Sequence, residues 1–135
     1  MSIQYSGTTR GYQMLWDQTN AIVLLVSAGG RILGANPTAL RAYGYDEAEL
    51  VGQDITLIRA PAHLSEVESQ LRQARTGVTF ETVHRRKDGS CFPVEVRSNG
   101  CFVGEHEQML ISIISDISHR KRQEATVQLL QQIDS

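Results

Sequence analysis

A chain of 135 residues is long enough for one domain that buries its own hydrophobic core, so disulfides or a structural metal are not needed to hold it together. Its composition is ordinary for a globular protein, with 41% hydrophobic and 21% charged residues, and a net charge of −2 excludes bulk attraction to nucleic acids or acidic lipids. Because the longest apolar run is far below the roughly 20 residues that span a bilayer, we expect no membrane contact by this domain and a cytoplasmic protein with reduced Cys91 and Cys101.

The N-terminal segment divides into a tail and a short helix. Residues 1–9 are polar without periodicity, which predicts a flexible tail. An amphipathic helix is predicted over 10–20, because Tyr12, Leu15 and Trp16 recur on one helical face. Two interpretations of this face remain open: it caps the domain's own sheet, or it contacts a second copy of the chain.

A buried hairpin is predicted next. Residues 21–26 form an apolar run rich in β-branched side chains, which indicates a strand buried on both faces. Paired glycines follow, and glycine accepts the positive φ of a tight turn, so 31–35 is expected to return as the partner strand. Asn36 and Pro37 then predict a helix start, since asparagine caps helices and proline suits their first turn. A hairpin that leads directly into a helix indicates an α+β domain.

Several short helices are predicted to follow this hairpin. The first covers 37–43 and ends at Gly44, which suits a left-handed cap. Asp46 and Glu49 have the spacing of a capping box for a second short helix. A longer helix is expected from Pro61 to about residue 75. Such short helices suit a lid over a sheet.

Three more strands are predicted after the helices. Strand character returns over 78–86, and the Asp-Gly turn within 87–90 leads into the alternating strand 92–96. A loop or bulge is expected at 98–100, and 108–117 forms the last apolar strand. The total is five strands, two before the helices and three after them.

The final segment, 119–135, has a polar helical pattern. Leu129 and Ile133 have a spacing compatible with a coiled coil. A helix that is polar on nearly every side has little to stabilise it alone. We therefore expect a helical signalling linker that leads to an output domain outside this sequence.

Four motifs identify a family resemblance. They are ILGANPTAL at 32–40, YGYDEAELVGQ at 43–53, HRRKDGSCFPVEV at 84–96 and DISHRKR at 116–122. With these motifs the chain resembles a PAS domain, a sensory fold of signalling proteins, from about Gln13 to Gln123. The resemblance implies a PAS fold: a five-stranded antiparallel sheet in the order 2-1-5-4-3, with helices over one face enclosing a pocket, and a sensor core over 21–118.

The resemblance also identifies a joint between sensor and linker. Family members carry an Asp-Ile-Thr motif at the end of the last strand, which corresponds here to Asp116, Ile117 and Ser118. Either Asp116 or Ser118 can accept hydrogen bonds from the free N–H groups of the linker helix and so fix its direction. The motif is either an ordinary helix cap or a joint through which strain in the last strand reaches the helix.

The resemblance implies no particular cofactor. Light-sensing flavin members place a reactive cysteine where this chain has Ile55, so cysteinyl-flavin photochemistry is not expected. One group of haem-binding members has a histidine five residues after a proline and a tyrosine three further on, whereas counting from Pro61 gives Glu66 and Ser69. Haem is therefore not expected, and the cofactor stays unknown.

Other chemistry is not indicated by the sequence. No catalytic set is identified, so an enzyme is not expected. The basic clusters at 85–87 and 120–122 lack interleaved aromatic residues, which argues against nucleic-acid binding by this domain. The cysteines and histidines lack the Cys-x-x-Cys spacing of structural zinc sites, so no metal is expected. The residues concerned are Cys91, Cys101, His84 and His106.

A pocket between sheet and lid is the candidate site for a small-molecule ligand. Small polar residues on the last strand, Ser112 and Ser115, would leave space and hydrogen bonds for it. The alternative is that the apolar residues simply fill a core. The predicted lining comprises Leu24, Leu33, Leu40, Tyr43, Ile55, Ile58, Leu64, Phe80, Val94, Ile113 and Ser115.

These observations lead to one main hypothesis and one alternative. The main hypothesis is a sensory module of a bacterial-type signal transduction protein, which binds a small ligand and relays it through Asp116 and Ser118 to a covalently linked output domain. That domain would be a diguanylate cyclase, a histidine kinase or a transcription regulator. A homodimer through the terminal helices is expected, with Tyr12, Leu15 and Trp16 as candidate contacts. The alternative is a ligand-free scaffold for dimerisation and spacing.

Overall fold

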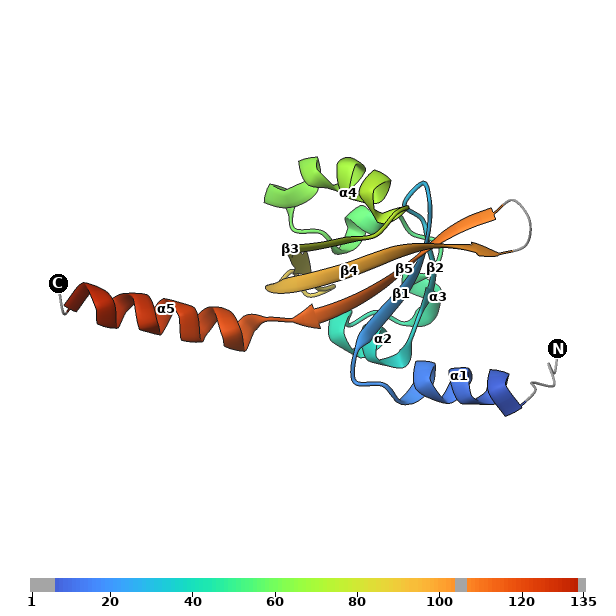
Figure 1. Ribbon diagram of the computed structural model, residues 1–135, viewed down its shortest axis with the longest axis horizontal. Coiled ribbons are helices and arrows are strands. Elements are labelled where there is room, and N and C mark those ends of the chain that lie inside the picture. The colour runs from blue at the N-terminus through green and yellow to red at the C-terminus, as the bar shows by residue number, and fades with distance from the viewer. Residues whose placement is uncertain (1–6, 104–106, 134–135) are drawn as a thin grey trace.

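An antiparallel sheet of five strands forms the centre of the domain, in the spatial order β2-β1-β5-β4-β3 (Figure 1). This order confirms the predicted α+β fold class. The computed structural model describes residues 7–103 and 107–133. The strands are β1 (Ile22–Ser27), β2 (Ile32–Ala35), β3 (Val78–Arg85), β4 (Cys91–Val103) and β5 (Glu107–Asp116). The helical elements are α1 (Gly7–Gln18), α2 (Pro37–Tyr43), α3 (Glu47–Leu50), η1 (Ile55–Ile58), η2 (Pro61–Glu66), α4 (Val67–Ala74) and α5 (Ser118–Ile133).

Strand β1 lies between β2 and β5 and sets which residues face the core. Leu24 pairs with Ala35 on one side and with Ser112 on the other. Ile22, Leu24 and Val26 are buried, whereas the alternate residues of β1 are only partly buried. The prediction of a strand buried on both faces is therefore correct for the face that packs into the core, whereas the other face is only partly buried.

The core fills the space between the inner face of the sheet and the helices. Residues from β1, β4 and β5 meet those from α2, α3, η1 and α4, so burial of apolar area holds the two layers together. The largest side chains with less than 2% exposure are Tyr43, Leu24, Ile32, Leu50, Ile58, Leu110, Ile114, His84, Val26, Val94 and Asn36.

The predicted helix caps are present. The Asn36 side chain accepts a hydrogen bond from the backbone N–H of Ala39 at the start of α2, and Gly44 ends that helix with φ 78°. The capping box of Asp46 and Glu49 begins α3. These local signals are confirmed because each depends only on residues within one turn of chain.

Three predicted boundaries are corrected. Helix α1 begins at Gly7, inside the expected tail. The expected long helix from Pro61 is split into η2 and α4, and η2 has no buried residue to pack it against the domain. The expected loop at 98–100 is continuous strand, because Gly100 pairs with Leu110. The glycine serves a close approach instead of a turn: a Cβ there would lie 2.5 Å from the carbonyl oxygen of Arg75.

The two terminal helices leave the domain in different ways. α1 lies against α2, and the hydroxyl of Thr38 donates to the carbonyl of Thr19 at 2.6 Å. α5 extends from the end of β5 as an arm that points away from the sheet (Figure 1). Within the described part of the chain, we find no helix with the length and apolarity that crossing a membrane requires.

Candidate ligand cavity and linker joint

A cavity of about 40 Å³ lies between the inner face of the sheet and the layer of η1 and α4. Strands β1, β3, β4 and β5 supply its floor. Most of its walls are apolar, and polar side chains enter at four positions. The lining residues are Leu24, Val26, Ile55, Arg59, Val67, Gln70, Leu71, Phe80, His84, Val96, Leu110, Ser112 and Ile114.

Part of the predicted lining borders this cavity. Leu24, Ile55 and Phe80 do so, and Ser112 enters from β5, where its hydroxyl lies 2.7 Å from that of Ser98. Other predicted residues belong to the core or pack against it without reaching the cavity. These are Leu40, Tyr43, Ile58 and Val94.

Four predicted lining residues are exposed and do not line the cavity: Leu33, Leu64, Ile113 and Ser115. The error on β5 has a physical cause. This strand carries apolar residues on both faces, so its sequence does not define which face is buried. Pairing with β1 does define it, and turns Ser112 and Ile114 inward and Ile113 outward.

Arg59 is a polar residue of the cavity that the sequence analysis missed. It is only 5% exposed, although it carries a guanidinium. Its Nη1 donates to Oε1 of Gln70 at 2.6 Å, and its Cζ lies 5.5 Å from the ring centre of Phe80. Burial lowers the pKa of Arg59, but arginine remains protonated in proteins, so the cavity holds a positive charge. An arginine directly after the apolar segment 55–58 was the available signal.

His84 enters the cavity from β3 and is 2% exposed. Its Nδ1 lies 2.6 Å from the hydroxyl oxygen of Tyr43 on α2. Burial, together with the nearby charge of Arg59, lowers the pKa of His84 to about 3, so the imidazole is neutral. Burial also raises the pKa of Tyr43, whose hydroxyl stays protonated. Both groups are satisfied when Tyr43 donates to Nδ1 and the imidazole proton lies on Nε2.

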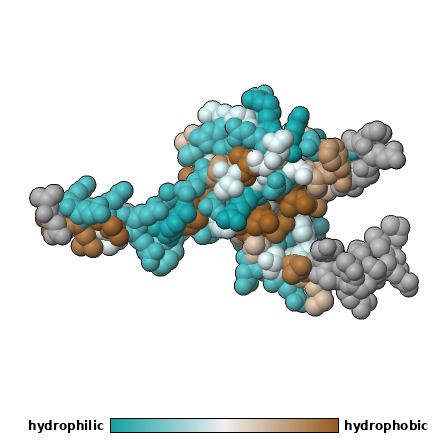
Figure 2. Space-filling model, in the orientation of Figure 1, coloured by the Kyte–Doolittle hydropathy of each residue, from teal (hydrophilic) through white to brown (hydrophobic). Residues whose placement is uncertain are grey.

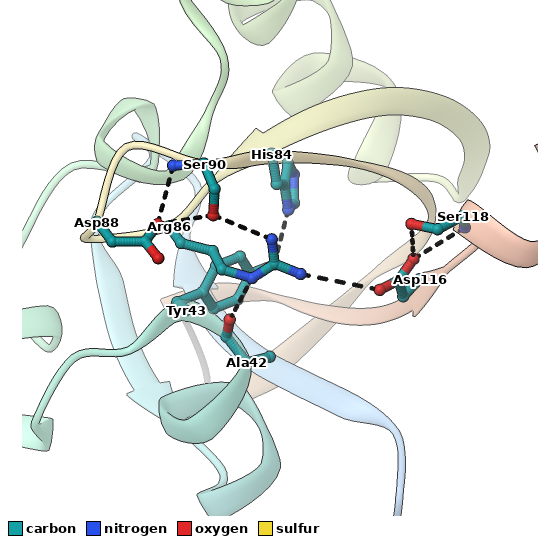
Figure 3. A network of polar contacts seen from close by, with 8 residues as sticks. All are labelled: Ala42, Tyr43, His84, Arg86, Asp88, Ser90, Asp116 and Ser118. Carbon is teal, nitrogen blue, oxygen red and sulfur yellow. Dashed lines mark hydrogen bonds and ion pairs between the residues drawn. The ribbon is translucent and has the colours of Figure 1, made fainter.

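Arg86 connects the end of α2 to the end of β5 (Figure 3). Its Nε donates to the carbonyl of Ala42 at 3.1 Å, and its Nη2 lies 4.0 Å from Oδ2 of Asp116. Its Cζ is 4.0 Å from the ring centre of Phe92, which holds the guanidinium in place by a cation–π contact. Since Ala42 precedes Tyr43, a chain of contacts runs from the cavity to Asp116.

Asp116 accepts hydrogen bonds at the start of α5. Its Oδ1 accepts from the backbone N–H of Ser118 at 2.8 Å and from the hydroxyl of Ser118 at 2.5 Å. Of the two candidate acceptors in this motif, Asp116 is therefore the one that accepts, and Ser118 is the donor. The cap lies where β5 ends and α5 begins, so it fixes the joint between them.

Comparison with known proteins agrees with this geometry. A family model described as a PAS domain matches residues 19–119. The chain belongs to the PAS domain family. A PAS domain of an HTR-like protein from Haloarcula marismortui has 27% identity and a TM-score of 0.72, with 82% of this chain and 92% of that chain covered.

Two further structures share the fold at lower identity. A domain of a sensory box sensor histidine kinase/response regulator from Geobacter sulfurreducens has 18% identity and a TM-score of 0.71, covering 81% of this chain and 94% of its own. An RNA-binding Light-Oxygen-Voltage receptor has 18% identity and a TM-score of 0.77, covering 98% of this chain and 41% of its own. At these identities, both likenesses show a shared fold.

Ion pairs hold the first turn of α5 against the sheet of this PAS domain. Arg120 and Lys121 both contact the carboxylate of Glu81 on β3, and Lys121 does so at 2.9 Å. Arg120 also lies 3.9 Å from the carboxylate of Glu95 on β4. These groups are partly exposed, so each pair is weak, but together they limit the directions in which α5 leaves the domain.

The predicted dimer contacts lie on α1. Leu15 is 66% exposed and Trp16 is half-buried, whereas the side chain of Tyr12 lies outside the described residues. A dimer through this helix stays a prediction.

No group of three or more potential metal ligands gathers among the described residues. Nδ1 of His84, a nitrogen that could bind a metal, is hydrogen-bonded to the hydroxyl of Tyr43. His106, the other histidine weighed for zinc, lies outside the described residues.

Proposed function

We propose that this PAS domain is a non-enzymatic sensory module that binds a small ligand in the cavity and relays its presence through α5 to a linked output domain. The chain of contacts from the cavity to the cap of α5 carries this proposal. It passes from His84 to Tyr43, along the end of α2 to Arg86, and on to Asp116 (Figure 3).

The relay requires two arrangements of this chain. A ligand that touches His84 changes the signal only if it binds one arrangement better than the other, and couplings of this kind are typically ~1–3 kcal/mol. A cavity of about 40 Å³ favours a ligand of few atoms, since sites for drug-sized ligands enclose roughly 300–1,000 Å³. A flavin or haem would require the cavity to expand.

Replacement of Asp116 by alanine is expected to free the direction of α5 while costing only about 1 kcal/mol of stability, the usual value of a helix cap. The variant loses both hydrogen bonds to Ser118 and the contact with Arg86. Spin labels at the exposed positions Thr79 and Gln128 measure the distance between β3 and α5. We expect a narrow distance distribution in the wild type and a broad one in the variant.

Asp88 provides a matched control for this experiment. It accepts from the backbone N–H and the hydroxyl of Ser90 at 2.8 and 2.6 Å, which is the arrangement of Asp116 and Ser118, but in the hairpin turn between β3 and β4. Because Ser90 also accepts from Nη1 of Arg86 at 3.2 Å, this control tests whether a change on the other side of Arg86 is enough to free α5. The Asp88→Ala variant should lose similar stability and keep the narrow distribution. An unchanged distribution in Asp116→Ala would reduce the motif to an ordinary cap.

The partners of the domain follow from its exposed apolar surface. Figure 2 shows apolar surface over the middle of the domain and toward the end of α5. On α5 the exposed apolar residues include Leu129 and Ile133, the pair with coiled-coil spacing. This supports a homodimer in which two copies of α5 run side by side into the output domains.

The likeness to domains of histidine kinases favours a kinase over a cyclase or a transcription regulator as the output domain. We propose a cytoplasmic location for the protein.

The small volume of the cavity also favours a second candidate, a ligand-free scaffold for dimerisation and spacing. Native mass spectrometry of the purified domain distinguishes the two, because one spectrum reports subunit count and any retained molecule. A dimer with a discrete additional mass supports the sensor. A bare dimer that no compound stabilises supports the scaffold, since a ligand at about 100 times its dissociation constant adds ~2.7 kcal/mol of stability.

A further inference from the structure

We propose that the cavity binds a small carboxylate, or an oxyanion of similar size, which pairs with Arg59. This inference rests on the sensory function proposed above and names the class of its ligand. Three observations support it: the buried guanidinium of Arg59 has no paired carboxylate in the described part of the chain, hydrogen-bond donors line the cavity, and the cavity is small.

Among the described residues, no carboxylate is hydrogen-bonded or ion-paired to the buried guanidinium of Arg59. The guanidinium makes its one side-chain hydrogen bond within the described structure to the neutral amide of Gln70. Burial lowers the pKa of Arg59 and the charge of Glu66 raises it, but Glu66 is exposed and its carboxylate contacts Nε2 of Gln70 and Nδ1 of His63, each at 3.4 Å. A buried charge is costly unless it is paired and hydrogen-bonded. The arrangement leaves one position for an anion.

Two hydrogen-bond donors belong to residues that line the cavity. Nε of Arg59 is buried and has no hydrogen-bond partner among the described residues. With Nδ1 of His84 bonded to Tyr43, its Nε2–H is a second donor on a residue that lines the cavity. The lining contains no aspartate or glutamate. Two donors, one charged, and no acidic side chain select an anion over a cation or an amine.

The size of the cavity limits the anion to a few atoms. One water molecule needs roughly 10–15 Å³ of cavity volume, so a cavity of about 40 Å³ holds about three atoms of the size of a water molecule. Formate, nitrate and acetate have three or four non-hydrogen atoms and fit with little adjustment. Leu24, Val26 and Leu110 would contact the methyl group of acetate. A dicarboxylate would bring a second charge against these apolar walls.

Nuclear magnetic resonance of the isotope-labelled domain tests the inference at the atom concerned. The probes are formate, acetate and nitrate, and acetamide is the neutral analogue of acetate. Ionic strength is kept constant with gluconate, which is too large for the cavity. We expect acetate to shift the Nε–Hε resonance of Arg59 in a saturable way, and acetamide to bind at least tenfold more weakly.

Three variants complete the test. Arg59→Met should weaken acetate binding at least tenfold, while Arg59→Lys, which keeps the charge, should retain part of it. Arg72→Met is the matched control, because Arg72 is an exposed arginine of the same helical layer and is paired with Glu68. It should bind acetate as the wild type does. The Nε–Hε signal of the wild type decides the matter even if Arg59→Met fails to fold.

Each outcome has a separate meaning. Equal binding of acetate and acetamide, or acetate binding that survives in Arg59→Met, overturns the anion site and leaves the sensory proposal intact. An Arg59 resonance that no small anion shifts also overturns it. If acetate binds through Arg59 and the distance between the spin labels on Thr79 and Gln128 does not change, the anion site stands and the relay is wrong.

Discussion

Replacement of Asn36 by alanine is expected to lower the free energy of unfolding by about 3 kcal/mol, and the melting temperature by on the order of 10 °C. The side-chain oxygen of Asn36 accepts from the backbone N–H groups of Val23 and Ala39, each at 3.0 Å, and its amide donates to the carbonyl of Ala21 at 2.9 Å. Alanine would leave these two N–H groups and this carbonyl without their hydrogen bonds at a position that is fully buried. Urea unfolding followed by circular dichroism measures the change.

The size of this effect comes from the position of Asn36, which ties the start of α2 to β1. Asn20 provides a control because it is an exposed asparagine one residue before Ala21. We expect Asn20→Ala to change stability by less than about 0.5 kcal/mol. A loss below about 1 kcal/mol in Asn36→Ala would mean that water replaces the lost bonds and that Asn36 is only a helix cap.

The fold was predictable from the sequence where the signals are local. Asn36 before Pro37 is a local signal for the start of a helix, and an Asp-Gly pair defines the turn between β3 and β4, with Gly89 at φ 89°. The strand order itself came from the family resemblance. Five strands with these turns are compatible with several sheet orders, and only contacts far apart in sequence select one.

The cavity was less predictable, because its lining depends on pairing between distant strands. Ile113 and Ile114 are equally apolar, and only the pairing of β5 with β1 decides that Ile114 faces inward. Arg59 and His84 were missed for a related reason. Arginine and histidine are usually exposed. In the fold, an isolated β-bridge pairs the backbones of Arg59 and His84, and both side chains line the cavity together with residues of α4. The sequence around each residue gives no sign of this pairing.

Buried polar residues in this core are destabilising unless they are satisfied, so their presence points to function. Apolar residues in place of Arg59 and His84 would fill the same space without a desolvation cost. Only Nδ1 of His84 is satisfied by Tyr43, and Arg59 is satisfied only in part. The proposed anion completes the set, which explains why a core of this size contains a guanidinium.

Stability is expected to fall by about 2 kcal/mol when the pH is lowered from about 7.5 to about 5, because of His84. The pKa of this histidine is about 3 in the folded protein, against an ordinary value of 6.5 that we assign to the unfolded chain. As the pH falls below 6.5, the unfolded chain therefore takes up a proton that the folded protein does not. The stability is fully present above about pH 7 and is lost progressively toward pH 3. Urea unfolding at a series of pH values measures the slope.

Two variants identify the group that causes this slope. Glutamine at position 84 cannot be protonated, so His84→Gln should be less stable at neutral pH and nearly independent of pH between about 5 and 7. His63→Gln is the control, since His63 lies on η2, away from the core, and this variant should keep the slope. A slope that persists in His84→Gln would show that a group other than His84 causes it.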